Sequence, residues 1–258
     1  MFDRSYREKV GGRSFVIPII NGRKTYVSEP WMSEVLERLL ALKSGAFIDV
    51  GVNLGQTLLK VAAIDPDRTY VGFEPNPACV DYAWKLIQKN GLKFTVVPAG
   101  ITDRTTLLHL EMFREDDTDP SASIVPAFRS NVVASRSVMV VDPEQLPEGT
   151  LPEEVAVVKI DVEGGELFVL RGLLPLLRRA RPFLVVEVLP PSAPDRVERQ
   201  VELERHLAEL DYRLFRIRRD DREQLQTIDP IETLGIQTDL LSCDYVFAPA
   251  ELAASLRN

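Results

Sequence analysis

Short apolar segments alternate with amphipathic segments along most of this 258-residue chain. This alternation constrains the fold more than any other feature, because strands that are connected through helices pair in parallel. In the segment 55–64, for example, apolar residues recur at helical spacing on one face. The sequence therefore predicts an α/β fold with a largely parallel sheet. We expect its strands at 46–50, 69–74, 93–98, 155–161, 182–188, 212–217 and 244–247.

Residues 1–45 fall outside the alternation and contain one expected helix, at 32–42. We interpret this region as a cap that packs on a single large domain, 46–258. The segment of about 105–142 interrupts the domain as a side insertion, because two strand-like runs flank a polar, acidic loop there. The last two expected strands follow the last long helix and suit an antiparallel hairpin at the sheet edge.

The composition excludes several classes of protein. Apolar residues make up 45% of the chain and charged residues 27%, which is ordinary for a globular domain and excludes disorder. The net charge of -8 argues against nucleic acid or an anionic membrane as the main partner. No run is long and apolar enough for a membrane span, and two cysteines cannot form a disulfide framework. We expect a cytoplasmic protein, and the sequence leaves open whether it forms a homo-oligomer.

The run Asp49-Val-Gly51-Val-Asn53-Leu-Gly55 lies where the first expected strand ends and a helix begins. In open parallel sheets, ligands bind beyond the carboxyl ends of the strands. Glycines allow a tight turn and a close approach of a ligand, and the free N–H groups of the next helix favour an anionic group. The run is neither a Walker loop nor a Gly-x-Gly-x-x-Gly site. A tight turn without a ligand is the alternative.

Glu74 ends the second expected strand, 19 residues after Gly55. An acidic residue about 20 residues beyond the glycine turn is typical of a site that holds the hydroxyls of a nucleoside ribose. A carboxylate accepts two hydrogen bonds from a cis-diol and repels a 2′-phosphate. The glycine turn and Glu74 together indicate a nucleoside site, although a solvated carboxylate at the strand end is the simpler alternative.

A third motif gathers carboxylates at the end of the strand 155–161, in the run Lys159-Ile-Asp161-Val-Glu163-Gly-Gly-Glu166. Such side chains could hold a cation, orient an amine or accept a proton. Glu166 is also well placed for the first turn of a helix. Glu187 ends the next strand and could join the cluster, which makes Asp161, Glu163 and Glu187 the candidate ligands of a divalent metal ion.

The order of these motifs resembles the FkbM family of S-adenosylmethionine-dependent methyltransferases. The matching runs, between about residues 45 and 190, are DVGVNLG, EPNP, KIDVEGGE and VLRG. Val52 and Gly165 stand where the family usually has alanine. The resemblance implies a Rossmann-like class I methyltransferase fold, with seven mostly parallel strands, an antiparallel last strand and helices on both faces.

The resemblance also implies roles for individual residues. Asp49, Gly51, Asn53 and Gly55 would border the methionine end of S-adenosylmethionine. Glu74 would bind the ribose diol with Asn76 nearby, and residues from Gly100 to Asp103 would lie near the adenine. Asp161 would lie at the methyl-transfer end.

Methyl transfer to a hydroxyl needs a base or a metal, because such an oxygen is a weak nucleophile. Our preferred base is Glu163, with Asp161 as its alternative or partner. His109 is a third candidate, although a single histidine in a strand is more often structural.

The leading hypothesis is therefore an O-methyltransferase that acts on a hydroxyl of a sugar, glycan or secondary metabolite. An NAD-dependent oxidoreductase or epimerase would share the ribose carboxylate, but the glycine spacing disfavours it and a Tyr-x-x-x-Lys pair is missing. A protein that binds S-adenosylmethionine without catalysis is a further alternative.

Overall fold

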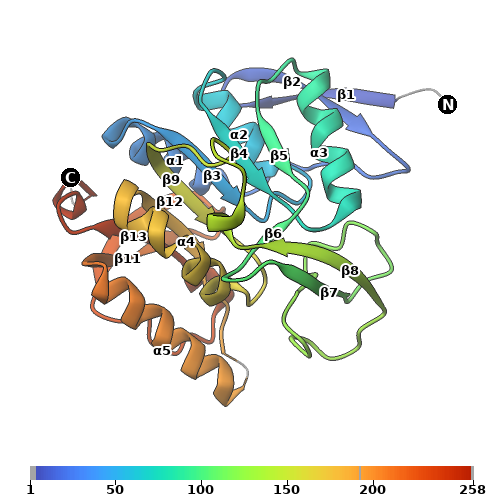
Figure 1. Cartoon of the computed structure of the whole chain (residues 1–258). Coiled ribbons are helices and arrows are strands. Elements are labelled where there is room, and N and C mark those ends of the chain that lie inside the picture. Colours follow the sequence, from blue (N-terminus) through green and yellow to red (C-terminus); the bar gives the residue numbers. More distant parts are fainter. Residues whose placement is uncertain (1–3, 192, 257–258) are drawn as a thin grey trace.

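The computed structural model describes residues 4–191 and 193–256, which form one large sheet, two smaller sheets and surrounding helices (Figure 1). Residues 1–3 and 257–258, at the outer ends of the two expected regions, lie outside the described residues. The strands are β1 (Arg4–Val10), β2 (Arg13–Ile19), β3 (Ala46–Val50), β4 (Tyr70–Phe73), β5 (Thr95–Val97), β6 (Gly100–Ile101), β7 (Thr106–Met112), β8 (Ala134–Val141), β9 (Val155–Ile160), β10 (Phe183–Glu187), β11 (Tyr212–Arg219), β12 (Leu225–Ile231) and β13 (Asp244–Pro249). The α-helices are α1 (Pro30–Leu42), α2 (Gln56–Ile64), α3 (Pro77–Lys89), α4 (Glu166–Ala180) and α5 (Pro194–Glu209).

The large sheet has the strand order β12-β11-β13-β10-β9-β3-β4-β5 in the described chain. The neighbouring strands β10, β9, β3, β4 and β5 pair in parallel. The strand β13 lies between β10 and β11 and is antiparallel to both. The expected Rossmann-like α/β fold with an antiparallel last strand is therefore confirmed. The expected number of seven strands is wrong, because the sheet has eight.

The additional strand, β12, explains this difference. It pairs antiparallel with β11 and forms the edge of the sheet, where we expected the hairpin of β11 and β13. Its sequence, LQTIDPI, interrupts its apolar residues with three polar ones and contains Pro230. Proline cannot donate to a strand ladder but is tolerated at a sheet edge. An edge strand buries little, so it lacks the apolar run that marked the other strands.

Helices cover both faces of the large sheet and bury one apolar cluster on each. Neighbouring strand residues point to opposite faces, so Phe47 packs in the cluster of α1, α2 and α3, whereas Ile48 packs in the cluster of α4 and α5. The same alternation separates Val157 from Val158 on β9. No helix within the described ranges combines the length and apolar character that crossing a bilayer requires.

The remaining strands form two small sheets. β1 and β2 make an antiparallel hairpin whose apolar residues join the cluster of the first three helices. β6, β8 and β7 form a three-stranded sheet (Figure 1), in which β7 and β8 are the expected antiparallel pair. The residues 113–133 between β7 and β8 form the insertion loop, which returns from the small sheet to the carboxyl ends of the large sheet.

Candidate functional site

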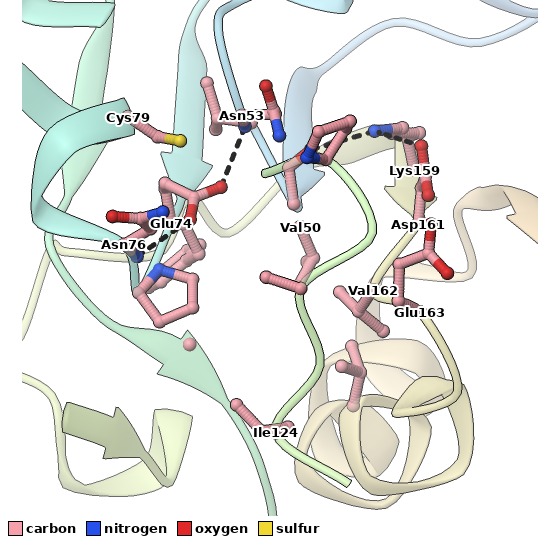
Figure 2. A pocket seen from close by; sticks show the side chains of 18 of the residues that line it. Val50, Asn53, Glu74, Asn76, Cys79, Ile124, Lys159, Asp161, Val162 and Glu163 are labelled. Carbon is pink, nitrogen blue, oxygen red and sulfur yellow. Dashed lines mark hydrogen bonds and ion pairs between the residues drawn. The ribbon is translucent and has the colours of Figure 1, made fainter. Parts of the chain in front are cut away.

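A cavity of about 290 Å³ lies beyond the carboxyl ends of β3, β4, β9 and β10, and the insertion loop passes across it (Figure 2). Its volume is close to the lower end of the range for small-molecule sites. Most of the residues expected at a ligand site line this cavity: Gly51, Asn53, Glu74, Asn76, Gly100, Asp161, Glu163 and Glu187.

The glycine turn forms one wall of the cavity, between β3 and α2. Gly51 has a φ of +93°, and a Cβ atom added there would lie 1.9 Å from the carbonyl oxygen of Asp161. Only glycine therefore allows the end of β3 to approach the end of β9 this closely. Gly55 also has a positive φ and precedes the first residue of α2. The turn thus brings backbone of two strands together at the cavity.

Glu74 follows β4 and lies with Asn53 and Asn76 at one end of the cavity. We call it the ribose end, after the role that the sequence led us to expect for Glu74. The backbone N–H of Asn53 donates to Oε2 of Glu74, and that of Asn76 donates to Oε1, each over 2.8 Å (Figure 2). These two bonds fix the carboxylate but leave each oxygen a lone pair for a ligand. Burial raises the pKa of Glu74 to about 7, although the two N–H groups partly oppose the shift.

Asn76 has two further hydrogen bonds that tie this end to its surroundings. Its Oδ1 accepts from the backbone N–H of Ala78 over 3.1 Å and caps the N-terminus of α3. Its Nδ2 donates to the carbonyl oxygen of Asp117 in the insertion loop over 2.7 Å. The side chain therefore has a structural role at the position where the sequence places it near a ribose.

Asp49 does not line the cavity but lies behind it, fully buried. The hydroxyl of Tyr70 donates to its Oδ2 over 2.6 Å, and the ammonium of Lys159 lies 3.3 Å from its Oδ1. Burial raises the pKa of Asp49, and Lys159 and Tyr70 partly oppose the shift. Any influence of Asp49 on a ligand must therefore pass through other residues.

Asp161, Glu163 and Glu187 lie together at the opposite end of the cavity, the carboxylate end. Burial, together with the nearby Asp161 and Asp244, raises the pKa of Glu187 to about 10. Burial also raises the pKa of Glu163, although the guanidinium of Arg129 partly opposes the shift. Raised pKa values make carboxylates stronger bases than carboxylates in water.

The insertion loop holds Glu163 in place through two of its residues. The hydroxyl of Ser123 donates to the backbone carbonyl oxygen of Glu163 over 2.7 Å, and the guanidinium of Arg129 forms an ion pair with the Glu163 carboxylate. Phe128 packs directly on Gly164, where an added Cβ would lie 2.1 Å from its ring. The geometry of the carboxylate end therefore depends on a segment that is distant in the sequence.

The three candidate metal ligands line the same cavity. Within the described part of the chain, however, no group of three or more His, Cys, Asp or Glu side chains is arranged to hold a metal ion. Asp161 is instead bound to Lys159, and Glu163 to Arg129.

His109 is not brought together with these carboxylates. It lies on β7 and lines a separate groove with Arg104, Ser135 and Arg171, where its Nδ1 is 3.4 Å from the hydroxyl of Ser135. This groove lies against the small sheet and α4.

Sequence reasoning assigned no role to several residues at the cavity. Lys159 lies on β9, two residues before Asp161, which directly follows the strand. Because side chains alternate along a strand, the spacing of two could have predicted that both point to the same side of the sheet. Glu29 and Asp119 also line the cavity. Glu29 directly precedes α1 and Asp119 lies in the insertion loop, so neither belongs to a regular pattern of the sequence.

Comparison with known proteins decides the family. A family model described as the Methyltransferase FkbM domain matches residues 49–214, more than half of the chain. This chain belongs to the FkbM family of S-adenosylmethionine-dependent methyltransferases. The nicotinamide alternative considered above is therefore wrong. No curated protein matches the sequence of this FkbM-family chain.

Solved structures include another family member. Methyltransferase FkbM from Methylobacillus flagellatus matches with a TM-score of 0.50 and 14% identity over 79% of this chain and 43% of that one, which shows a shared fold. Our chain thus spans less than half the length of that protein. The O-methyltransferase TomG from Streptomyces achromogenes, solved with S-adenosylmethionine, gives a TM-score of 0.48 at 15% identity over 87% of this chain and 81% of that one. A putative O-methyltransferase from Klebsiella pneumoniae gives 0.48 at 16% identity over 84% and 78%.

Proposed function

We propose that this FkbM-family chain transfers the methyl group of S-adenosylmethionine to a hydroxyl oxygen of a sugar, glycan or other small molecule. The observation that carries the proposal is the pair of unlike ends of one cavity. A fixed carboxylate suited to a ribose diol lies at one end, and carboxylates with raised pKa values lie at the other.

The residues present fit the cofactor. Glu74 keeps a free lone pair on each oxygen, which matches the two hydroxyls of a ribose. At the other end, Asp161 and Glu163 provide negative charge toward the positively charged sulfonium and ammonium groups of the methionine part. In the proposed arrangement, Gly100 and Asn76 lie beside the nucleoside, and Gly51 lines the wall between the two ends of the cavity. Gly55 does not line the cavity, and it forms the turn before α2.

When bound, the cofactor supplies an electrophilic methyl group on a sulfonium. The protein has to align the acceptor hydroxyl with the carbon–sulfur bond and to accept the hydroxyl proton. In the proposed reaction, Glu163 would accept that proton on a carboxylate oxygen while the cofactor supplied the methyl group, and the electron pair of the broken carbon–sulfur bond would remain with the cofactor. The insertion loop lines the cavity and narrows its access to solvent. Asp161 supports the positive end of the cofactor, and His109 takes no part.

An acceptor screen tests this function. The purified protein is incubated with S-adenosylmethionine and a panel of sugars, alcohols, phenols, amines and thiols, and mass spectrometry identifies both S-adenosylhomocysteine and the methylated product. We expect methyl ethers from hydroxyl acceptors. Products that carry the methyl group only on nitrogen, sulfur or carbon would contradict the proposed acceptor class.

A further inference from the structure

Lys159 connects the glycine turn with the carboxylate end. Its side chain is almost completely buried, with 5% exposed. Its ammonium donates to the carbonyl oxygen of Gly51 over 3.0 Å and lies 3.2 Å from Oδ2 of Asp161 (Figure 2). It also lies 3.3 Å from Oδ1 of Asp49, its register partner on β3. Lys159 thus contacts one group behind the cavity wall and two groups at the wall itself.

These contacts form a continuous polar chain from the core to the cavity. The hydroxyl of Tyr70 binds Asp49, Asp49 faces Lys159, and Lys159 faces Asp161. Asp49 is fully buried, whereas the side chain of Asp161 is 41% exposed. Asp161 is therefore the member most open to a ligand, and Lys159 lines the cavity wall beside it.

The charged groups of this series of contacts leave negative charge at the cavity. A buried ammonium is unfavourable unless it is paired, and the two carboxylates raise the pKa of Lys159 above its ordinary value despite its burial. One ammonium thus faces two carboxylates, and Asp161 is bound on one side only. No hydrogen bond to its other oxygen, Oδ1, is present in the described chain, so this oxygen can accept one from a ligand.

We propose that Lys159 is a positioning residue for the methionine end of S-adenosylmethionine. Through its ammonium, it fixes the carbonyl of Gly51 and the carboxylate of Asp161 relative to each other, so that both face the positive groups of the cofactor. This role rests on the cofactor site proposed above and deepens it. It gives the lysine of the KIDVEGGE run a task that differs from proton transfer, since its pKa is raised.

A simpler role for Lys159 is to neutralise Asp49 and thereby stabilise the fold. Both roles predict that Lys159→Met destabilises the protein, because the variant leaves a buried carboxylate without its partner. They differ once Asp49 is also neutralised. In Asp49→Asn/Lys159→Met, the uncompensated charge is absent, but the contacts with Gly51 and Asp161 are still missing.

The test compares two ligands in four proteins. Isothermal titration calorimetry measures the affinities for S-adenosylmethionine and for adenosine, which lacks the methionine part, in wild type, Lys159→Met, Asp49→Asn and Asp49→Asn/Lys159→Met. Thermal unfolding measures the stability of each protein. We expect the double variant to recover most of the Tm lost in Lys159→Met. It should still bind S-adenosylmethionine about tenfold or more weakly than Asp49→Asn does, a loss of the size expected for hydrogen bonds to charged groups. Its affinity for adenosine should match that of Asp49→Asn.

Two results would overturn the proposal. If the double variant binds S-adenosylmethionine as tightly as Asp49→Asn, Lys159 only neutralises Asp49. If both ligands lose affinity equally, the change is not confined to the methionine end. Should Lys159→Met fail to fold, the double variant and Lys159→Arg still decide the question. Lys159→Arg retains the charge opposite Asp49, but a planar guanidinium cannot repeat the three contacts. We expect it to fold and to bind S-adenosylmethionine more weakly without losing adenosine affinity, and unchanged affinity would contradict the role.

This result is independent of the acceptor. Neither titration contains an acceptor, so a failure of hydroxyl methylation in the acceptor screen would leave the binding comparison intact. Conversely, hydroxyl methylation by a Lys159 variant with normal affinity would support the proposed function and reject the role of Lys159.

Discussion

The two ends of the cavity are held by different parts of the chain. At the ribose end, Glu74 is fixed by backbone N–H groups that lie 21 and 2 residues away in the sequence, at the ends of neighbouring strands. At the carboxylate end, Glu163 is held by Ser123 and Arg129, which lie 40 and 34 residues away in the insertion loop. The first end is therefore built by the sheet itself, whereas the second depends on the docking of a loop. We expect cofactor binding and acceptor chemistry to respond separately to mutation.

The largest expected effect is the loss of kcat when the proposed base at the carboxylate end is removed. Glu163→Gln removes the proposed base but keeps the shape of the side chain, so kcat should fall by about 10²–10⁴-fold. The Kd of S-adenosylmethionine should change by less than about threefold, because the ribose end is intact. Steady-state kinetics and calorimetry measure the two quantities.

Glu166→Gln is the matched control for this variant. Glu166 belongs to the same motif, but its Oε1 accepts from the backbone N–H of Gly164 and it does not line the cavity. Glutamine can retain that bond, so kcat should remain close to the wild-type value. Full activity of Glu163→Gln would refute the assignment of the base.

The next effect concerns the ribose end. Glu74→Ala removes the proposed acceptor of two ribose hydrogen bonds, and bonds to a charged group contribute about 1.5–3 kcal/mol each. We expect the Kd of S-adenosylmethionine to rise by about 100-fold or more. Calorimetry with S-adenosylmethionine measures this, and Glu163→Gln serves as the control that should retain affinity. Near-normal binding by Glu74→Ala would show that the ribose is held elsewhere.

A smaller effect follows from the pKa of Glu74. Its folded value of about 7 lies above the ordinary 4.5, so the folded protein without ligand binds the extra proton between these pH values. Ionisation of Glu74 therefore lowers the stability of the unliganded protein as the pH rises through this window. The ribose diol favours the ionised form. The affinity for S-adenosylmethionine should thus weaken below pH 7, by up to about tenfold per pH unit.

Calorimetry between pH 5.5 and 8.5 checks this pH dependence. Glu74→Gln is the control, because it cannot titrate and should bind with an affinity that is nearly independent of pH in the same range. An equal pH dependence in both proteins would assign the titration to another group. Asp244 is one such group, because burial also raises its pKa to about 7.

The smallest effect tests how the loop supports the carboxylate end. The buried hydroxyl of Ser123 donates to Glu163 and accepts from the backbone N–H of Val125. Ser123→Ala should lower the free energy of unfolding by about 1 kcal/mol, measured by urea denaturation. It should also lower kcat while leaving the Kd of S-adenosylmethionine unchanged. A loss of cofactor affinity instead would mean that the two ends are not independent.

Local patterns in the sequence were sufficient to predict much of this molecule. Gly51 and Glu74 follow strands that apolar runs identify, and parallel pairing brings such strand ends to one edge of the sheet. The strands β1 and β12 were missed because their partly exposed residues lack a continuous apolar run. The strand β2 has such a run, but it was missed because it lies outside the alternation of strands with helices. Asp49 was expected beside a ligand, but it is fully buried and does not line the cavity. The backbone of the turn at Gly51 lines the cavity instead.

The sequence by itself determined the alternation of strands and helices from β3 to α5 in the large sheet and the presence of carboxylates at the ends of β4, β9 and β10. These features depend on side-chain periodicity and on short spacings along the chain. Only the tertiary structure decided that Lys159 lies between Asp49 and Asp161, and that Ser123 and Arg129 hold Glu163. Such contacts join segments that are far apart in the chain, and they form only when the packing of the sheet and the insertion loop brings those segments together.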